Sequence, residues 1–184
     1  SLTSYRGGLY VIPSYTKGVY RRLNDGSASN SSARGSSWEY CGAPGDRRCM
    51  TLGVHRGDLY AGGNEYSGVW RYIGGTEWES IGTQKGPAAL VEDGYECESQ
   101  IYSFMTWGGR LHIGTWPSGS GFRYEGGTDW TFCGRLGEER EVMGVAAYNG
   151  SFYAGTLPLA QVYRYDGDED WSVTGRVDHT PGVT

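Results

Sequence analysis

The chain is built from short segments in which apolar and polar side chains alternate, and turn residues separate these segments. In residues 161–165, for example, two tyrosines alternate with a valine and an arginine. Alternation over about four to eight residues is typical of a β-strand that buries one face. No stretch shows sustained apolar spacing of the kind that an amphipathic helix requires. The pattern therefore predicts an all-β protein.

The last part of the chain shows how these segments follow one another. We expect four strands there, at residues 142–148, 151–154, 161–165 and 171–175. The dipeptide Asn149-Gly150 between the first two is typical of a tight β-hairpin turn. Short strands joined by such turns predict one four-stranded antiparallel unit.

The same unit occurs four times. A tryptophan stands at the start of each expected fourth strand, at intervals of roughly 40 to 50 residues, at Trp38, Trp78, Trp130 and Trp171. A repeat of this length is typical of a solenoid or a propeller, in which each unit buries its apolar surface against its neighbours. The units are expected at about 1–45, 46–84, 98–136 and 140–178, within a single domain covering 1–184.

The repeated residues resemble a known family. Val-Tyr-Arg-Tyr or a close variant marks the third strand, and a tryptophan follows the second tyrosine by the same interval at Tyr72 and Trp78, Tyr124 and Trp130, and Tyr165 and Trp171. Together with the Leu-Tyr-Ala-Gly and Gly-Gly-Thr-Asp-Trp segments, this resembles a kelch-like or bacterial extracellular β-propeller repeat over about residues 50–178. The first unit departs from the pattern, because a serine-rich stretch at 24–37 is inserted in it.

The resemblance implies a β-propeller with four-stranded antiparallel blades. Four blades lie in this chain, and two alternatives stay open, a complete ring of four or a part of a larger ring. Propellers of this sort serve as binding platforms as often as enzymes, so the fold alone does not decide the function.

The repeated tryptophans and the arginines on the third strands are expected to be structural. The arginines stand at the same place in three units, at Arg71, Arg123 and Arg164. Because their period matches that of the units, we expect them to pack between sheets, with each guanidinium paired to a carbonyl or carboxylate.

The loops between the second and third strands give the candidate binding site. They occupy the same place in every unit, so we expect them on one face of the protein. Aromatic and polar side chains gather in them, at Tyr15, Tyr66, Trp116, Ser118 and Asn64. A flat apolar ring beside hydroxyl and amide groups suits a sugar, which needs both stacking and hydrogen bonds. The expected ligand is a glycan or a protein, and the alternative is that these aromatics only pack over the loops.

Four cysteines bear on the compartment. Their placement predicts disulfides Cys41–Cys49 and Cys97–Cys133. Disulfides persist in oxidising surroundings, so such pairs would indicate an extracellular or periplasmic protein. The alternative is four buried free thiols. No Cys-x-x-Cys pair is present to suggest structural zinc.

Other short motifs carry weaker expectations. Asn30 and Asn149 satisfy the acceptor pattern for N-glycosylation, which matters only in a eukaryotic secretory route. Arg56-Gly57-Asp58 is expected to be a hairpin turn rather than a recognition motif. The acidic cluster at 166–170 lacks the spacing of an EF-hand loop. We expect no metal and no cofactor.

Composition narrows the partners. The formal net charge is −5, so the chain offers no basic field for nucleic acid, and no apolar run is long enough for membrane insertion. The function expected is a non-catalytic extracellular binding module. Two alternatives stay open, an assembly protein that associates with itself or with further blades, and a sialidase-like glycan-processing enzyme. An enzyme is disfavoured, because turns such as 127–130 lack the leading Ser and Asp of a sialidase Asp-box.

Overall fold

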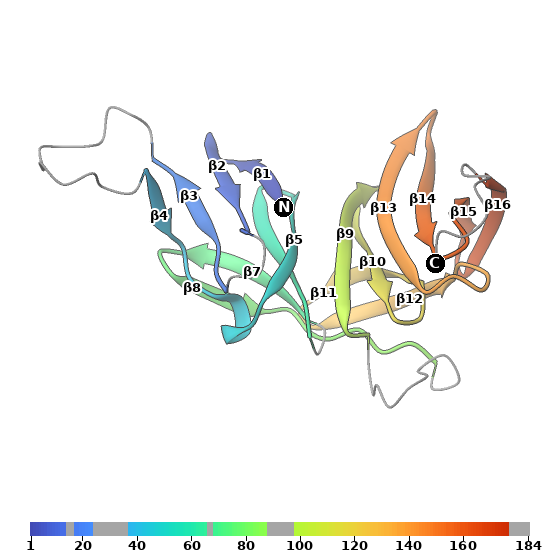
Figure 1. Ribbon diagram of the computed structural model, residues 1–184, viewed down its shortest axis with the longest axis horizontal. Helices are drawn as coiled ribbons and strands as arrows, with labels where there is room; N and C mark the ends of the chain where they lie inside the picture. Colours follow the sequence, from blue (N-terminus) through green and yellow to red (C-terminus); the bar gives the residue numbers. More distant parts are fainter. Residues whose placement is uncertain (14–16, 24–36, 66–67, 88–97, 177–184) are drawn as a thin grey trace, which may run out of the picture.

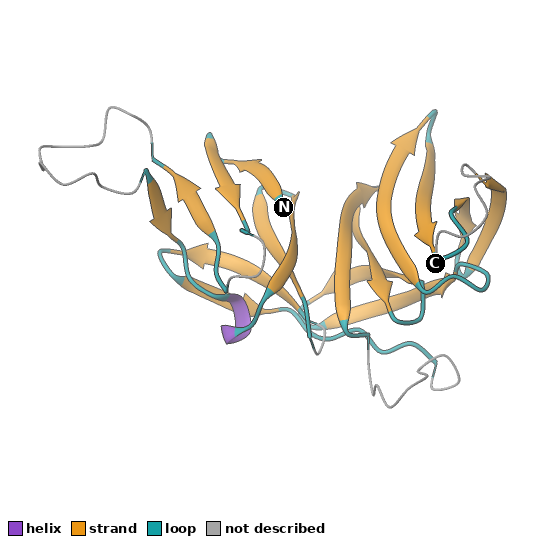
Figure 2. Ribbon diagram, viewed as in Figure 1, coloured by secondary structure: helices purple, strands orange, loops and turns teal. Residues whose placement is uncertain are grey.

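The protein is all-β. A computed structural model describes residues 1–13, 17–23, 37–65, 68–87 and 98–176. These residues form sixteen strands in four separate four-stranded antiparallel sheets, together with one short 3-10 turn, η1 (Pro44–Asp46) (Figures 1 and 2). In the described part of the chain, no helix is long and apolar enough to cross a bilayer.

Each sheet is a simple up-and-down meander whose strands pair in chain order. Sheet 1 contains β1 (Leu2–Tyr5), β2 (Gly8–Val11), β3 (Tyr20–Arg22) and β4 (Trp38–Tyr40). Sheet 2 contains β5 (Cys49–His55), β6 (Asp58–Gly63), β7 (Val69–Gly74) and β8 (Glu77–Ser80). Sheet 3 contains β9 (Gln100–Trp107), β10 (Arg110–Trp116), β11 (Ser120–Gly126) and β12 (Asp129–Arg135). Sheet 4 contains β13 (Glu141–Tyr148), β14 (Ser151–Leu157), β15 (Gln161–Gly167) and β16 (Asp170–Arg176). The sheets lie within the four segments expected from the repeat.

A two-residue turn joins the first two strands of every sheet. Both residues of the turn have positive φ, as at Asn149 (49°) and Gly150 (75°), a geometry that matches the twist of the paired strands. Arg56 (49°) and Gly57 (81°) form the same turn in sheet 2. The Arg-Gly-Asp tripeptide is therefore a hairpin turn, as expected.

The sheets are packed side by side through their first strands. β5 lies against β1 and β9, and β9 lies against β13 (Figure 1). The apolar core lies between sheets, where Leu59 of sheet 2 packs with sheet 1 and Leu111 of sheet 3 packs with sheet 2. No sheet closes into a ring, so the described residues form an open array of four units.

A tryptophan ties each sheet to the one before it. The indole Nε1–H of Trp78 donates to the Cys41 carbonyl at 2.7 Å, that of Trp130 to Ile81 at 2.8 Å, and that of Trp171 to Cys133 at 2.6 Å. Each indole also lies against the tyrosine of its own third strand, with ring centroids 4.8 to 5.0 Å apart. The expectation of packing between sheets is confirmed for these three tryptophans, whereas Trp38 lies against Arg22 of its own sheet, 5.9 Å from the guanidinium carbon to the ring centroid.

A glycine completes each of these joints. Gly42, Gly82 and Gly134 follow the accepting carbonyls and have φ of 92°, 99° and 89°. A Cβ at any of them would overlap the backbone of the third-to-fourth strand turn in the next sheet. Only glycine combines this backbone conformation with so close an approach.

The arginines of the third strands pair with carboxylates. Arg71 pairs with Glu79 at 2.5 Å, Arg123 with Glu125 at 2.7 Å, and Arg164 with Asp166 at 2.7 Å. Each partner lies within the same sheet as its arginine. Exposed ion pairs of this kind contribute little to the free energy of unfolding, so they are not what stabilises the fold.

The predicted Cys41–Cys49 disulfide is wrong. Cys41, Cys49 and Cys133 are buried free thiols. Cys41 follows β4, the outer strand of sheet 1, whereas Cys49 begins β5, the first strand of sheet 2, so the connecting loop crosses from one sheet to the next. The thiol of Cys41 instead donates to the Glu39 carbonyl at 3.7 Å, and that of Cys133 donates to Thr131 at 3.5 Å. Cys97, the expected partner of Cys133, lies outside the described residues.

The indole hydrogen bond gives a first prediction. We expect Trp130→Phe to lower the free energy of unfolding by about 1–3 kcal/mol, because the carbonyl of the buried Ile81 loses its donor. Trp130→Ala also removes the ring and should cost about 3–5 kcal/mol. Urea unfolding followed by fluorescence measures both, and equal midpoints for Trp130→Phe and wild type would contradict this role.

The joint glycine gives a second prediction. Gly134 and Gly175 occupy the same position in sheets 3 and 4 and both have positive φ, at 89° and 145°. A Cβ at Gly134 overlaps the Glu169 backbone, whereas no described atom lies within 4 Å of one at Gly175. Gly134→Ala should therefore lower the free energy of unfolding by about 1–3 kcal/mol more than Gly175→Ala. The matched pair separates steric overlap from backbone strain, and equal losses would exclude the overlap.

Candidate functional site

The turns and loops of the array lie on two opposite sides. On one side lie the hairpin turns, which join first to second strands and third to fourth strands, and we call this the hairpin face. On the other lie the loops between second and third strands, the connections between sheets and η1, and we call this the rim face. The predicted binding residues belong to the rim face.

The structure brings two of the predicted residues together. Gln100 of β9 pairs with Trp116 of β10 on one side and forms a bridge to Asn64 on the other. Asn64 and Trp116 are both half-buried, so each presents part of its side chain to solvent. Tyr15 and Tyr66, the other two aromatic candidates, lie outside the described residues.

Ser118 is buried in the loop between β10 and β11 and forms hydrogen bonds there. It is 1% exposed, and its hydroxyl donates to Glu98, whose carboxylate also accepts from the Thr115 hydroxyl at 3.0 Å. Burial raises the pKa of Glu98, and these hydrogen bonds act against the rise. The buried Glu139 has the same place in sheet 4, where it accepts from the backbone N–H of Leu159 at 2.9 Å. Buried carboxylates therefore hold the rim loops, a role that spacing in the sequence did not suggest.

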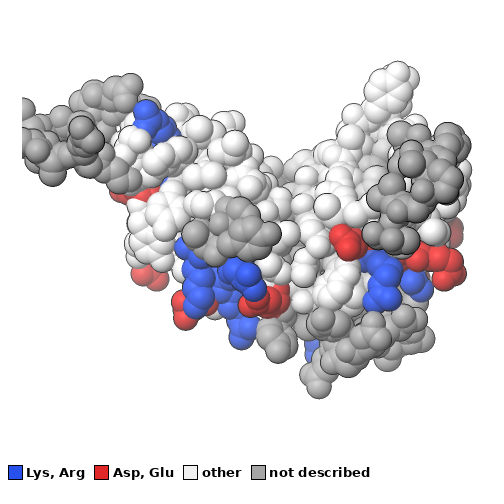
Figure 3. Space-filling view, viewed as in Figure 1, with Lys and Arg blue, Asp and Glu red and all other residues white. Residues whose placement is uncertain are grey.

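A charged groove lies beside sheets 1 and 2 on the rim face. Its lining includes Lys17 and Asp46, paired at 3.3 Å, and Arg48 and Glu65, also an ion pair. Figure 3 shows basic and acidic side chains interspersed along the lower edge of the molecule. Because the charges are mutually paired and exposed, the groove offers no single-sign field.

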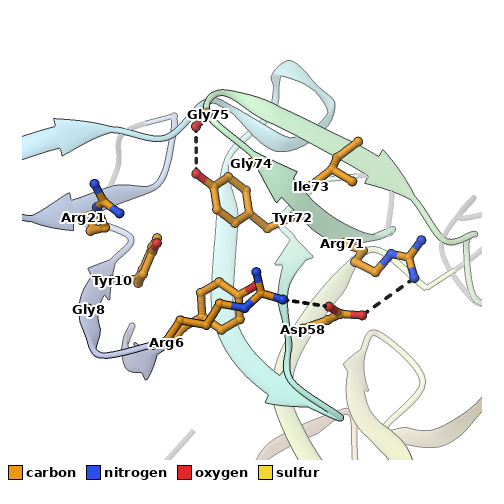
Figure 4. A pocket seen from close by; sticks show the side chains of 11 residues that line it. Arg6, Gly8, Tyr10, Arg21, Asp58, Arg71, Tyr72, Ile73, Gly74 and Gly75 are labelled. Carbon is orange, nitrogen blue, oxygen red and sulfur yellow. Dashed lines mark hydrogen bonds and ion pairs between the residues drawn. The ribbon is translucent and has the colours of Figure 1, made fainter.

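The hairpin face holds a more sharply formed cleft between sheets 1 and 2. It has a volume of about 420 Å³, and its apolar walls are the rings of Tyr5, Tyr10 and Tyr72. Figure 4 shows Tyr10 and Tyr72 on these walls. Tyr5 and Tyr10 meet edge to face with centroids 5.6 Å apart, and Tyr72 lies 6.0 to 6.4 Å from both. Gly8 also lines the cleft, and a Cβ there would crowd Tyr10 and Arg21.

Three guanidinium groups and one carboxylate line this cleft, those of Arg6, Arg21, Arg71 and Asp58. Asp58 lies 3.9 Å from Arg6 and 3.8 Å from Arg71 (Figure 4). Arg71 also pairs with Glu79 at 2.5 Å, and Arg21 pairs with Glu39 at 2.6 Å. Arg6 has the longest ion-pair distance of the three arginines, and its side chain is 72% exposed.

Tyr10 and Tyr72 of the cleft act as neutral hydroxyl groups. Burial raises the pKa of Tyr10, although the neighbouring Arg21 guanidinium acts in the opposite direction. Burial is also the main cause of the raised pKa of Tyr72, whose hydroxyl donates to the Gly75 carbonyl at 2.9 Å. Near neutral pH these phenols stay protonated and can donate or accept hydrogen bonds.

The equivalent space between sheets 3 and 4 is filled. Trp107, His112, Phe152 and Tyr165 pack there with ring centroids 5.3 to 6.2 Å apart. Between sheets 1 and 2, Tyr5 stands at the position of Trp107 and Tyr10 at that of His112. Leu59 stands at the position of Phe152. The smaller set leaves a hollow. This cleft was missed at the level of sequence, although its residues stand at repeated positions whose side chains change between units.

The remaining motifs form no site in the described residues. Asn149 is exposed at the tip of the β13–β14 hairpin, and Asn30 lies outside the described residues. Asp166 pairs with Arg164 and accepts from Ser172. In the described ranges no group of three or more histidine, cysteine, aspartate or glutamate side chains is placed to hold a metal ion.

His112 gives a prediction about pH. Its Nδ1–H donates to the Arg110 carbonyl at 3.2 Å, and its buried Nε2 has no described hydrogen-bond partner. Burial lowers the pKa of His112 to about 4, from the 6.5 of an exposed histidine. Because the imidazole binds a proton more readily in the unfolded chain than in the folded one, lowering the pH from about 6.5 to 4 favours unfolding. This effect of His112 should lower the free energy of unfolding by at most ~3 kcal/mol.

His112→Tyr is the matched variant, because sheets 1 and 2 carry Tyr10 and Tyr60 at this position. We expect its urea midpoint to change less between pH 7 and pH 5 than that of wild type. Identical pH profiles for the two proteins would show that His112 does not carry the effect.

Comparison with known proteins adds no family to this picture. No protein-family model matches the chain, and no curated protein matches it in sequence. The kelch-like resemblance therefore stays a prediction that rests on the repeated residues themselves.

Proposed function

We propose that this chain is a non-catalytic, extracellular or periplasmic binding module whose four sheets are successive blades of a β-propeller, and that its ligand is a carbohydrate carrying a carboxylate. The observation that carries the proposal is the cleft between sheets 1 and 2, where three tyrosine rings and three guanidinium groups meet around one hollow. The location rests on the repeat resemblance, because the described cysteines are unpaired.

The packing of the sheets supports the propeller. First strands lie against first strands, as around the axis of a propeller, and the same tryptophan and glycine joint recurs between each pair of sheets. Regular joints between identical units favour a radial arrangement, because the same rotation is applied at each step.

The cleft supports an acidic sugar as the ligand. A pyranose ring needs an apolar surface for its C–H face and hydrogen-bonding groups for its hydroxyls. The half-buried Tyr72 offers the larger accessible ring surface, whereas Tyr5 and Tyr10 line the cleft with 6% and 4% of their surface exposed. A carboxylate on the sugar would meet Arg6, whose side chain is 72% exposed, since guanidinium groups bind carboxylates in a paired geometry. Arg21 is already paired with Glu39 at 2.6 Å. The volume of about 420 Å³ lies within the range of small-molecule sites.

The same cleft gives no support to a glycosidase. Hydrolysis of a glycosidic bond usually needs two carboxyl groups that face each other across the substrate. Among the described residues that line the cleft, Asp58 is the one carboxylate, and two arginines flank it. Binding without turnover is therefore the function favoured here.

The proposal predicts charge-selective sugar binding. Calorimetric titration with glucuronic acid and with glucose should show binding of the acid alone or at least tenfold stronger binding of the acid, because a charge-assisted hydrogen bond contributes about 1.5–3 kcal/mol. Arg6→Gln should abolish this preference while leaving the fold intact, since the Arg6 side chain is 72% exposed.

Two control variants locate the site. Arg110→Gln removes an exposed arginine paired with Glu125 in sheet 3, away from the cleft, and should leave binding unchanged. Trp116→Ala tests the rim face. Loss of binding in Trp116→Ala with retention in Arg6→Gln would place the sugar at the rim and overturn the assignment to the cleft.

A further inference from the structure

The contact between neighbouring sheets has two distinct halves. We call the surface that packs on the preceding sheet the leading face and the one that packs on the following sheet the trailing face. Leucine or phenylalanine occupies one position of the leading face, as Leu59, Leu111 and Phe152, which are 0%, 1% and 2% exposed. Glycine occupies a position of the trailing face, where a Cβ at Gly62 would collide with Ile101 and one at Gly114 with Val142.

Sheet 1 has a leading face without a partner among the described residues. Leu9 stands where Leu59 stands in sheet 2, and Leu2 stands where Leu52 does. Leu9 is 42% exposed and Leu2 is 65% exposed, whereas Leu59 and Leu52 are buried. Two leucines are thus presented on the surface in the register that buries them elsewhere in the chain.

Sheet 4 has the complementary trailing face. Gly155 stands where Gly62 and Gly114 stand, yet no described atom lies within 4 Å of a Cβ there, and the same holds for Gly175 at the joint position. Tyr153 occupies the position of Tyr60 and His112 but is only half-buried, whereas those two lie against Tyr124 and Tyr165 of the next sheet.

We infer that a second copy of this chain docks the leading face of its sheet 1 on the trailing face of sheet 4, so that the chain assembles head to tail. The argument is continuity with an established interface, since the two exposed surfaces are the two halves of a contact that the chain already forms three times between its own sheets. The inference does not depend on sugar binding.

A second copy supplies both halves of the contact at once, a leading face at its sheet 1 and a trailing face at its sheet 4. Two chains can therefore close a ring in which every leading face is covered, and a geometry that does not close gives a longer assembly.

Light scattering coupled to size exclusion, over a wide range of protein concentration, tests the inference. The expected mass is at least twice the 20.1 kDa of one chain. Leu9→Asp, which places a charge in the proposed contact, should lower the mass to that of one chain. Ile73→Asp is the control, because Ile73 is 63% exposed and belongs to sheet 2, which is not an end sheet, so the assembly should persist in it.

A second variant acts from the other side of the contact. Gly155→Gln adds a side chain where no described atom lies within 4 Å of a Cβ, so it should fold normally and yet block the docking of a second copy. Near-ultraviolet circular dichroism checks the fold of each variant. A single-chain mass for wild type at every concentration, or an assembly that survives either Leu9→Asp or Gly155→Gln, would overturn the inference.

Discussion

The joint between neighbouring sheets is the constraint on which the rest of this structure depends. A four-stranded antiparallel sheet of this size has too little apolar surface to fold alone, so each sheet buries one face against the next. The indole of Trp78 donates to the backbone of sheet 1 at Cys41, and Gly42 lets the next turn approach at the same point. Because hydrogen bond and close contact adjoin, the joint sets both the spacing and the orientation of the two sheets. Its recurrence at Trp130 and Trp171 makes the array regular.

Because the joint holds the sheets together, the side chains between sheets on the hairpin face can differ from one pair of sheets to the next. The space between two sheets is walled by the same positions each time, but the side chains there differ. Trp107 and Phe152 fill the space between sheets 3 and 4, whereas Tyr5 and Leu59 leave the cleft open between sheets 1 and 2. Changes in side-chain volume at a few repeated positions therefore open a cleft without disturbing the joint. This cleft is the proposed binding site, and the exposed Arg6 at its margin is the group proposed to meet an anion.

The same architecture explains why the two end sheets each have a packing face that no described residue covers. In the interior of the array, each leading face is covered by the trailing face of its neighbour. Leu59 and Leu111 are buried there, and the trailing glycines Gly62 and Gly114 lie against Ile101 and Val142. At the ends, Leu9 and Gly155 are exposed with the same geometry. Exposed apolar side chains in a register that buries them elsewhere favour association, and the proposed assembly at the ends does not depend on the proposed binding at the cleft.

The sequence by itself determined the all-β class, the four units, the hairpin turns and the structural role of the tryptophans, because each depends on local periodicity and on residues such as Asn149-Gly150 and Trp130 that act where they stand. It did not determine the pairing of Cys41, since proximity along the chain does not reveal that the loop to Cys49 crosses between sheets. The burial of Ser118 over Glu98 and the meeting of Tyr5, Tyr10 and Tyr72 were likewise decided only in the tertiary structure. The physical reason is that the period of the repeat specifies which positions face the neighbouring sheet. The volume left between two sheets depends on the side chains of both sheets, which the period does not specify.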